Sequence, residues 1–314
     1  MERTVHTSEK GMRLDRFLRI HFPRAPAAAL LLRQGRLTVD GRKARGTDAL
    51  LPGQVVRLDE PQARPAAGGA IAGPSEAERA LLARITFFED DDLIVFDKPS
   101  GLAVHKGTRT SDDLDAILAK LVDAEGERPR LVHRLDKDTS GLLVAARRKR
   151  LAEDLGRAFA TRGVAKTYLA VVAGVPEPRV GRIATALKKV ETREGGRMVA
   201  AEPGDPQGQS AATAWEVVEV AADGRSSLVA FFPETGRQHQ LRVHAKLLGH
   251  PILGDRLYGD ARSASRLMLH AHRLNLPDGA GGMREFVAPV PEGFGRGTPA
   301  TRAGEGWRGG RNPD

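Results

Sequence analysis

The sequence contains no cysteine, which excludes disulfide bonds, zinc–thiolate sites and thiol nucleophiles. No apolar run approaches the roughly 18 residues that a membrane span requires. The first ten residues, MERTVHTSEK, also lack the apolar segment of a signal peptide. We therefore expect a cytoplasmic protein with no membrane partner, whose chemistry depends on side chains other than thiols.

The composition indicates a folded, basic protein. A chain of 314 residues with 40% hydrophobic residues is long enough for two domains with proper cores. The formal net charge is +9 and the sequence pI is about 10.1. Such a charge favours a polyanionic partner, and without membrane features nucleic acid is the better candidate.

The most informative stretch is HRLDKDTSGLLVAAR, residues 133–147. A polar segment precedes the apolar run 142–146, so a loop leads directly into a predicted core strand. Basic residues flank Asp136 and favour the ionised carboxylate of a nucleophile or base. The alternative is that Asp136 and Thr139 only cap a turn.

The N-terminal region predicts a small basic domain. Apolar residues within 14–22 have helical spacing, a second helix is predicted over 27–34, and an Asp40-Gly41 turn and a strand at 55–58 follow. The segments RLDRFL, LLRQGRLTVDGRKA and LLPGQVVRL resemble the S-four-type RNA-binding domain. That resemblance implies that five arginines face a phosphate backbone, namely Arg13, Arg16, Arg33, Arg36 and Arg42.

The remaining chain predicts a linker, a larger domain and a tail. The stretch PQARPAAGGAIAGP is too rich in Pro, Ala and Gly to bury a core. We predict an N-terminal domain over 1–60, a linker over 61–79, a catalytic domain over 80–290 and a disordered tail over 291–314. Many strands with few helices predict an α+β domain with a mixed, mainly antiparallel sheet flanked by helices. The polar segment 177–209 predicts either a basic hairpin that clasps substrate or a variable surface loop.

A second informative stretch covers residues 232–258. Thr235 is predicted to cap a helix that ends before Gly249. The sequence GRQHQLRVH places Arg237 and Arg242 near the start of that helix, where they would attract a phosphate or carboxylate. His239 lies beside them, but without cysteines or a regular set of carboxylates we expect no metal site.

Several motifs, in order, resemble the RluA-type pseudouridine synthases. They are KPSGLAVH, HRLDKDTSGLLVAAR, KTYLAVVAG, TGRQHQLRVHAKLLGHPILGDRLYG and RLMLHAHRL, and they cover about residues 11–290 together with the S-four-type pattern. The resemblance implies an isomerase that detaches uracil from ribose and rejoins it through carbon 5. It implies no cofactor, and attack at the sugar and abstraction of a ribose proton by the carboxylate both remain open.

The resemblance also implies roles for individual residues. Asp136 matches the catalytic aspartate, Tyr168 the tyrosine that lies against uracil, and Arg242 the basic residue paired with the aspartate. Arg134 matches the residue that enters the space of the flipped base. We expect further RNA contacts from His133 and Arg237, and packing beneath the base from Leu267 or Leu269.

The pattern favours the synthase C subgroup, whose members act on large-subunit rRNA. The expected partner is therefore rRNA of the large subunit or its precursor. We expect the protein to be a monomer. A tRNA-directed or synthase-D-like member is the close alternative. A noncatalytic RNA-binding assembly protein is a remote one. A glycosidase would need a carboxylate pair, which Asp136 and Asp138 would have to form.

Overall fold

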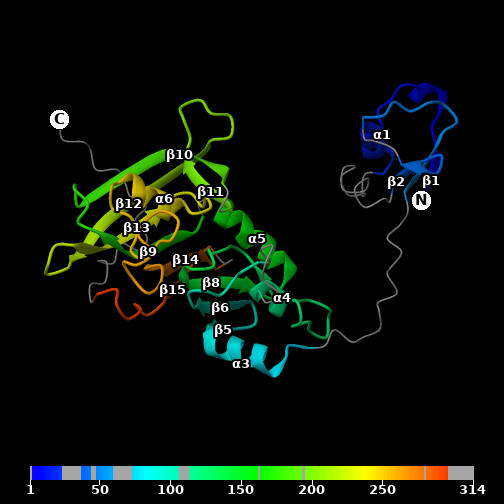
Figure 1. Cartoon of the computed structure of the whole chain (residues 1–314). Helices are drawn as coiled ribbons and strands as arrows, with labels where there is room; N and C mark the ends of the chain where they lie inside the picture. The colour runs from blue at the N-terminus through cyan, green and yellow to red at the C-terminus, as the bar shows by residue number, and fades with distance from the viewer. Residues whose placement is uncertain are drawn as a thin grey trace. The chain divides into compact units, whose positions relative to one another are not determined.

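The computed structural model describes residues 2–22, 37–43, 47–58, 73–105, 113–161, 163–192, 195–278 and 281–295. The chain forms two compact units, Met1–Ile71 and Ala72–Asp314. Each unit has its own hydrophobic core. Both are drawn in Figure 1.

The smaller unit packs one described helix against a four-stranded sheet with strand order β1-β4-β2-β3. Its elements are β1 (Glu2–Thr4), α1 (Leu14–His21), β2 (Leu37–Val39), β3 (Arg42–Lys43) and β4 (Val55–Leu58). Leu14 and Phe17 of α1 are fully buried against Leu37 and Val56 of the sheet. The predicted helix over 27–34, with Arg33 and Arg36, lies outside the described residues.

The larger unit is built on one sheet of 11 described strands. Its first elements are α3 (Glu76–Ile85), β5 (Thr86–Glu89), β6 (Leu93–Lys98), α4 (Leu114–Leu118), β7 (Arg130–Leu131), β8 (Ser140–Ala146) and α5 (Lys149–Ala160). They are followed by β9 (Ala165–Ala173), β10 (Val180–Thr192), β11 (Gly195–Ala200), β12 (Gln209–Val220), β13 (Ser226–Pro233), α6 (Gln240–Leu247), β14 (Leu269–Pro277) and β15 (Met283–Val287).

The sheet confirms the predicted α+β architecture. The strand order is β11-β10-β12-β13-β9-β14-β8-β6-β5, with β15 added to β14 and β7 to β8. Among the described pairs, β8 and β14 run parallel and the others run antiparallel. This single parallel pair joins the strands that precede α5 to those that follow it.

Strand β8 is apolar throughout because both of its faces are covered. Successive side chains of a strand point to opposite faces. Leu142 and Val144 pack on the side of α5, while Leu143 and Ala145 pack on the side of α4. A continuous apolar run is the pattern expected for a strand buried on both sides, and it gives the preceding loop a rigid support.

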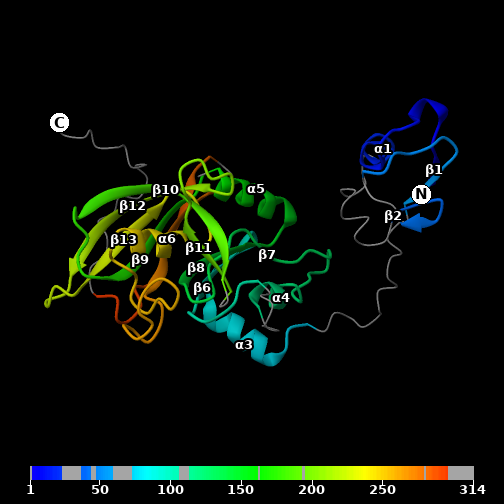
Figure 2. The same ribbon diagram turned by 45° about the horizontal axis from the view of Figure 1, so that its top comes forward.

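Three segments differ from or sharpen the sequence predictions. Helix α3 begins at Glu76, inside the predicted linker, because Ser75 and Glu78 form a capping box there. Phe294 is 1% exposed in the core beside β9 and β13, so the predicted disordered tail from 291 starts too early. Within the segment 177–209, β10 and β11 pair antiparallel, and β11 is an edge strand of the sheet (Figure 2). Within the described ranges, no helix is long and apolar enough to cross a membrane.

Candidate active site

Asp136 lies in the loop between β7 and β8. The loop is closed by a hydrogen bond from Thr139 N to the carbonyl oxygen of Asp136, 3.1 Å long. The Gly101 amide donates to the carbonyl of Lys137, and the Ser100 hydroxyl donates to the carbonyl of Asp138. The loop is therefore held by the segment that follows β6.

Lys98, the last residue of β6, is buried beneath this loop. Its ammonium group donates to the carbonyl oxygens of Pro99, Leu102 and Lys137, at 3.0, 2.9 and 2.8 Å. Burial lowers the pKa of Lys98 to about 8. Lys98 thus holds the backbone next to Asp136 by hydrogen bonds from the core.

Gly141, at the start of β8, allows this loop to approach β14. Its φ is +107°, and a Cβ added there would lie 2.3 Å from the carbonyl oxygen of Ala271. Only glycine accepts both the backbone conformation and the contact. The Ser140-Gly141 pair is therefore where Asp136's loop joins the parallel β8–β14 pairing.

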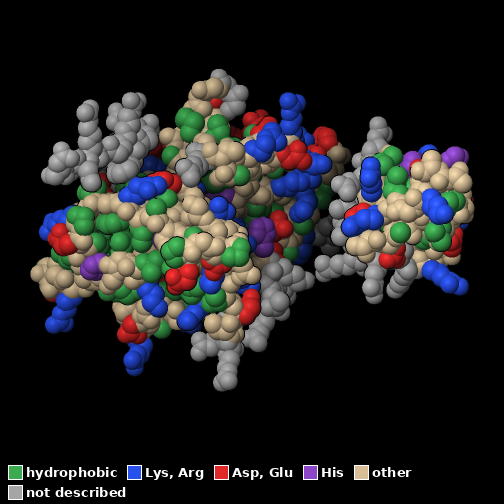
Figure 3. Space-filling model, turned by 90° about the horizontal axis from the view of Figure 1, so that it is seen from above, with side chains coloured by type: hydrophobic (Ala, Val, Ile, Leu, Met, Phe, Trp, Pro, Cys, Tyr) green, Lys and Arg blue, Asp and Glu red, His purple; other side chains and the backbone are tan. Residues whose placement is uncertain are grey.

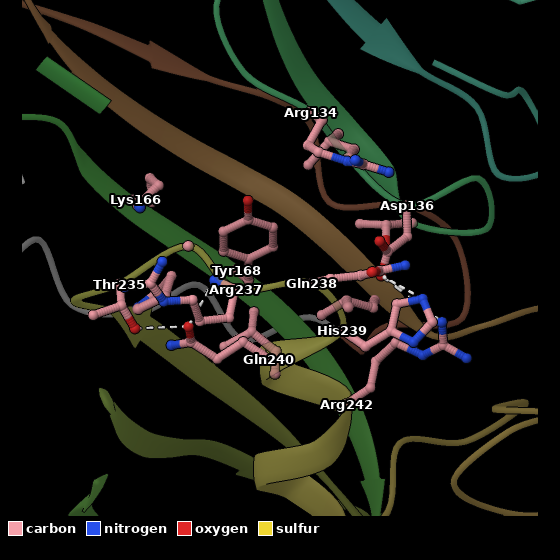
Figure 4. A pocket seen from close by; sticks show the side chains of 16 residues that line it. Arg134, Asp136, Lys166, Tyr168, Thr235, Arg237, Gln238, His239, Gln240 and Arg242 are labelled. Carbon is pink, nitrogen blue, oxygen red and sulfur yellow. Dashed lines mark hydrogen bonds and ion pairs between the residues drawn. The ribbon is translucent and has the colours of Figure 1, made fainter. Parts of the chain in front are cut away.

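A pocket of about 110 Å³ brings the predicted residues together. Its lining includes five residues singled out in the sequence, and these are Arg134, Asp136, Tyr168, Arg237 and Arg242. Leu269 also lines the pocket, whereas Leu267 does not. Figure 4 shows Asp136, His239 and Arg242 converging on one side of Tyr168.

Arg242 is held mainly by the carboxylate of Asp255, which lies in one of the family motifs but was given no role from the sequence. Its Nε and Nη2 donate to the two carboxylate oxygens of Asp255, both at 2.7 Å. Its Nη1 lies 3.8 Å from Oδ2 of Asp136. Asp255 also accepts from the Leu257 and Tyr258 amides, and these contacts and Arg242 hold the pKa of Asp255 below its usual value despite burial. Asp255 orients the guanidinium that faces Asp136.

His239 is the second group beside Asp136, with Nε2 3.8 Å from Oδ2. Its Nδ1 is hydrogen-bonded to the Tyr258 hydroxyl at 2.8 Å, and that hydroxyl accepts from the Met198 amide. The Tyr258 hydroxyl therefore holds the Nδ1 edge of the ring, and the Nε2 edge faces Asp136. Burial lowers the pKa of His239, so the ring is neutral near pH 7.

The predicted helix cap at Thr235 is wrong. Helix α6 begins at Gln240, and His239 before it has a positive φ of 51°. Thr235 instead donates to the side-chain oxygen of Gln240, which also accepts from the Arg237 amide. The Gln240 amide group donates to the carbonyl of Ala212 and so ties the loop to β12. This buried side chain, not a cap, shapes the turn over the pocket.

Tyr168 stands on β9 between β13 and β14. Burial, reinforced by the charge of Asp136, raises the pKa of Tyr168 well above its usual value. The phenol is therefore protonated throughout the neutral range. Lys166, two residues earlier, also lines the pocket, and burial lowers its pKa. The sequence motif KTYLAVVAG contained Lys166, but no role was predicted for it.

His133 does not line the pocket, and the structure argues against its predicted RNA contact. Its ring stacks on Phe159, with centroids 4.3 Å apart, and Nε2 accepts from the Val144 amide. Burial, followed by the charge of Lys166, lowers the pKa of His133 to about 3. The side chain is a neutral packing group because its ring is already used by α5 and β8.

The predicted phosphate-facing residues of the smaller unit are exposed where they are described. Arg13 forms an ion pair with Asp15 at 2.8 Å, and Arg16 and Arg42 are solvent-accessible. Within the ranges that the structure covers, no three His, Asp or Glu side chains gather in a group that could hold a metal ion.

Comparisons with known proteins identify the family. The family model for RNA pseudouridylate synthase matches residues 92–247. An RNA pseudouridine synthase of Zymomonas mobilis, described as uncharacterised, is 41% identical over 217 residues, which are 68% of this chain and 97% of the relative. Ribosomal large subunit pseudouridine synthase C of Rickettsia bellii is 34% identical over 294 residues, or 90% of this chain and 96% of the relative.

A solved structure agrees with these matches. The human RNA pseudouridylate synthase domain containing 4 aligns with a TM-score of 0.56 at 31% identity, covering 69% of this chain and 92% of its own. The motifs of the Asp136 loop, Tyr168 and Arg242 meet in one pocket of this fold. The chain therefore belongs to the RluA-type family of pseudouridine synthases and is an isomerase of that family.

Proposed function

We propose that this chain converts uridine to pseudouridine in RNA of the large ribosomal subunit, with Asp136 as the reacting carboxylate. The observation that carries the proposal is the pocket in which Asp136 faces Arg242 and His239 beside the ring of Tyr168. The choice of rRNA is supported by the likeness to the Rickettsia bellii protein, which spans 90% of this chain. Cytoplasmic action as a monomer is part of the same proposal.

The reaction only exchanges bonds, so the site needs no redox centre. The bond from ribose carbon 1′ to N1 breaks, a bond from carbon 1′ to C5 forms, N1 gains a proton and C5 loses one. The Asp136 carboxylate is placed either to attack the sugar or to remove a ribose proton. Arg242 keeps its charge throughout because the Asp255 carboxylate beside it raises its pKa further, despite burial.

The target base must leave its stack to reach this pocket, at a free-energy cost of about a few kcal/mol. Arg134 is exposed at the rim, and its planar guanidinium is suited to the space that the base vacates. The ring of Tyr168 offers an aromatic face to uracil, and its protonated phenol can donate a hydrogen bond. Asp138 is exposed and does not line the pocket. The pocket therefore lacks the second carboxylate that a glycosidase mechanism requires.

We further propose that the smaller unit is an S-four-type RNA-binding domain that uses Arg13, Arg16 and Arg42. Its support is the sequence pattern together with the exposure of these side chains. Such contacts release counterions from RNA, so binding should weaken steeply as salt concentration rises. A salt-independent affinity would count against this role.

A pseudouridine map of total RNA tests the proposed function. Cells lacking the protein are complemented with the wild type or with Asp136→Asn, and modified sites are compared. Loss of particular large-subunit rRNA sites, restored only by the wild type, is the expected result. If the lost sites lay in tRNA, the substrate would be wrong; if no site were lost, the catalytic assignment itself would be wrong.

A further inference from the structure

Lys166 is a pocket residue whose positive charge is not neutralised by the protein. It lies on β9 two residues before Tyr168, so both side chains project from the same face of the strand. Figure 4 shows Lys166 and Asp136 on opposite sides of Tyr168 in that view. The lysine therefore belongs to the end of the pocket away from the reacting carboxylate.

Other buried or half-buried cations of this unit have clear partners. Lys188 pairs with Asp205 at 2.6 Å, Arg242 with Asp255 at 2.7 Å, and Lys98 donates to three carbonyl oxygens. On the face drawn in Figure 3, Lys and Arg side chains commonly lie beside Asp and Glu. In the part of the chain that the structure covers, Lys166 has no ion pair or hydrogen bond from its ammonium group.

Burial without a carboxylate makes the charged form of Lys166 unfavourable in the free protein. Burial is the cause that lowers its pKa, and no acidic group compensates. The charge of Lys166 also contributes to the low pKa of His133. An unpaired buried cation does not stabilise the fold. Its presence in a pocket therefore points to a ligand that supplies the missing negative charge.

The surroundings of Lys166 leave room for that anion. A Cβ added to Gly236 would lie 4.0 Å from Nζ, so the loop passes Lys166 without a side chain of its own. Arg237 follows on the same loop, and its guanidinium uses Nε to donate to the carbonyl of Ser210. No acidic side chain lines this end, since the only carboxylate among the pocket-lining residues is Asp136.

We propose that Lys166 binds one of the two phosphodiesters that flank the target uridine while the uracil lies against Tyr168. Residues two apart on a strand are separated by about 6.5 Å, a distance that the ribose of one nucleotide spans. The ion pair fixes how far the nucleotide enters the pocket and so positions the sugar beside Asp136. The inference rests on the proposed function and adds the group that anchors the substrate.

The test uses the full-length protein and RNA oligonucleotides centred on the uridine found by the map. In two modified oligonucleotides, one flanking phosphate is replaced by a neutral methylphosphonate. A charge-assisted hydrogen bond is worth about 1.5–3 kcal/mol, so one methylphosphonate should lower kcat/KM of the wild type about 10- to 100-fold. On unmodified RNA, kcat/KM of Lys166→Met should be lower than that of the wild type by a similar factor. The methylphosphonate to which the wild type is sensitive should cause no further loss in this variant. Lys166→Arg should keep most of the sensitivity.

Lys149→Met, in an exposed lysine of α5 that does not line the pocket, is the matched control and should respond to the methylphosphonate as the wild type does. Lys166→Gln replaces the Met variant if that variant unfolds. Equal sensitivity of the wild type and the Lys166 variant to both methylphosphonates would overturn the proposal. A wild type that forms no pseudouridine in any RNA would instead overturn the proposed function, and the two failures are thus distinguishable.

Discussion

Arg242 gives both parallel hydrogen bonds of its guanidinium to Asp255 and presents only Nη1, at 3.8 Å, to Asp136. The Asp136 carboxylate therefore faces a positive charge without being locked into a bidentate pair. A carboxylate held in such a pair would have both oxygens occupied. Asp255 keeps Arg242 at the distance that leaves Asp136 free to reach substrate.

Replacing Asp255 with asparagine should reduce catalysis more than substrate binding. Arg242 loses its buried counter-charge and turns toward Asp136, and we expect kcat to fall about 100-fold with a smaller change in KM. Steady-state kinetics on the mapped RNA measure this change. Asp260→Asn, at an exposed residue 3.8 Å from Arg262, is the control and should leave kcat unchanged. A KM effect alone would contradict the positioning role of Asp255.

Replacing Lys98 with methionine should loosen the Asp136 loop. The carbonyls of Pro99, Leu102 and Lys137 lose their shared donor, and each unsatisfied buried group costs about 1–3 kcal/mol. We expect a lower free energy of unfolding and a kcat about 10- to 100-fold lower. Lys120→Met removes an ion pair with Glu78 outside this loop and should change kcat little. Wild-type kcat in Lys98→Met would show that the loop does not need this anchor.

Replacing Gly141 with alanine should destabilise the whole sheet. The new Cβ would lie 2.3 Å from the carbonyl oxygen of Ala271. The φ of residue 141, +107°, is also unfavourable for alanine. Overpacking and backbone strain together predict a loss of about 2–5 kcal/mol in the free energy of unfolding. Urea unfolding measures it. Gly156→Ala, in α5 with open space around its Cβ, should instead stabilise by about 0.5–1 kcal/mol.

Replacing Tyr168 with phenylalanine separates the phenol from the ring. Because burial and Asp136 raise the pKa of Tyr168, the group available near pH 7 is a protonated donor. We expect Tyr168→Phe to lower kcat about 100-fold with little change in KM, and Tyr168→Leu to raise KM as well through lost stacking. If the two variants behaved alike in both constants, the phenol would have no separate role.

Acid should destabilise the protein through its buried histidines. Burial lowers the pKa of His133 and His270 to about 3 and that of His244 to about 4. Below the ordinary histidine pKa of about 6.5 the unfolded chain binds protons that the folded chain does not, so stability falls as pH falls. Each of these histidines should lower the free energy of unfolding by about 1.6 kcal/mol between pH 6.5 and 5. Urea unfolding across this range should show a shallower slope for His244→Gln; parallel curves would refute the assignment.

Part of the site was predictable because its chemistry is concentrated in short motifs. Asp136, Arg237 and Arg242 stand out in local patterns of charge, whereas the roles of Arg134 and Tyr168, and the pairing of Arg242 with Asp136, came from the family resemblance. All five line one pocket. The apolar run after Gly141 predicted a buried strand, and β8 is that strand. Local spacing sufficed for this strand because its apolar run is set by neighbouring residues.

The features of the site that the sequence did not predict depend on contacts between residues distant in the chain. Asp255 lies within the motif GHPILGDRLYG and was given no role, yet the fold places it against Arg242. The Thr235 cap was wrong because the Gln240 side chain folds back onto the loop and starts the helix later. His133 was assigned to RNA from its motif, while Phe159 of α5 takes its ring. A sequence pattern does not show which distant partner will occupy a side chain.

The place of β14 in the sheet sets when the enzyme can become active during its own synthesis. This strand, Leu269–Pro277, lies between β9, which carries Tyr168, and β8, which follows Asp136. Until β14 has emerged from the ribosome, the nascent chain lacks the strand that pairs with both β8 and β9 and brings these two residues together. Catalytic competence therefore arrives late in translation, and truncations before Leu269 should yield proteins without a formed pocket.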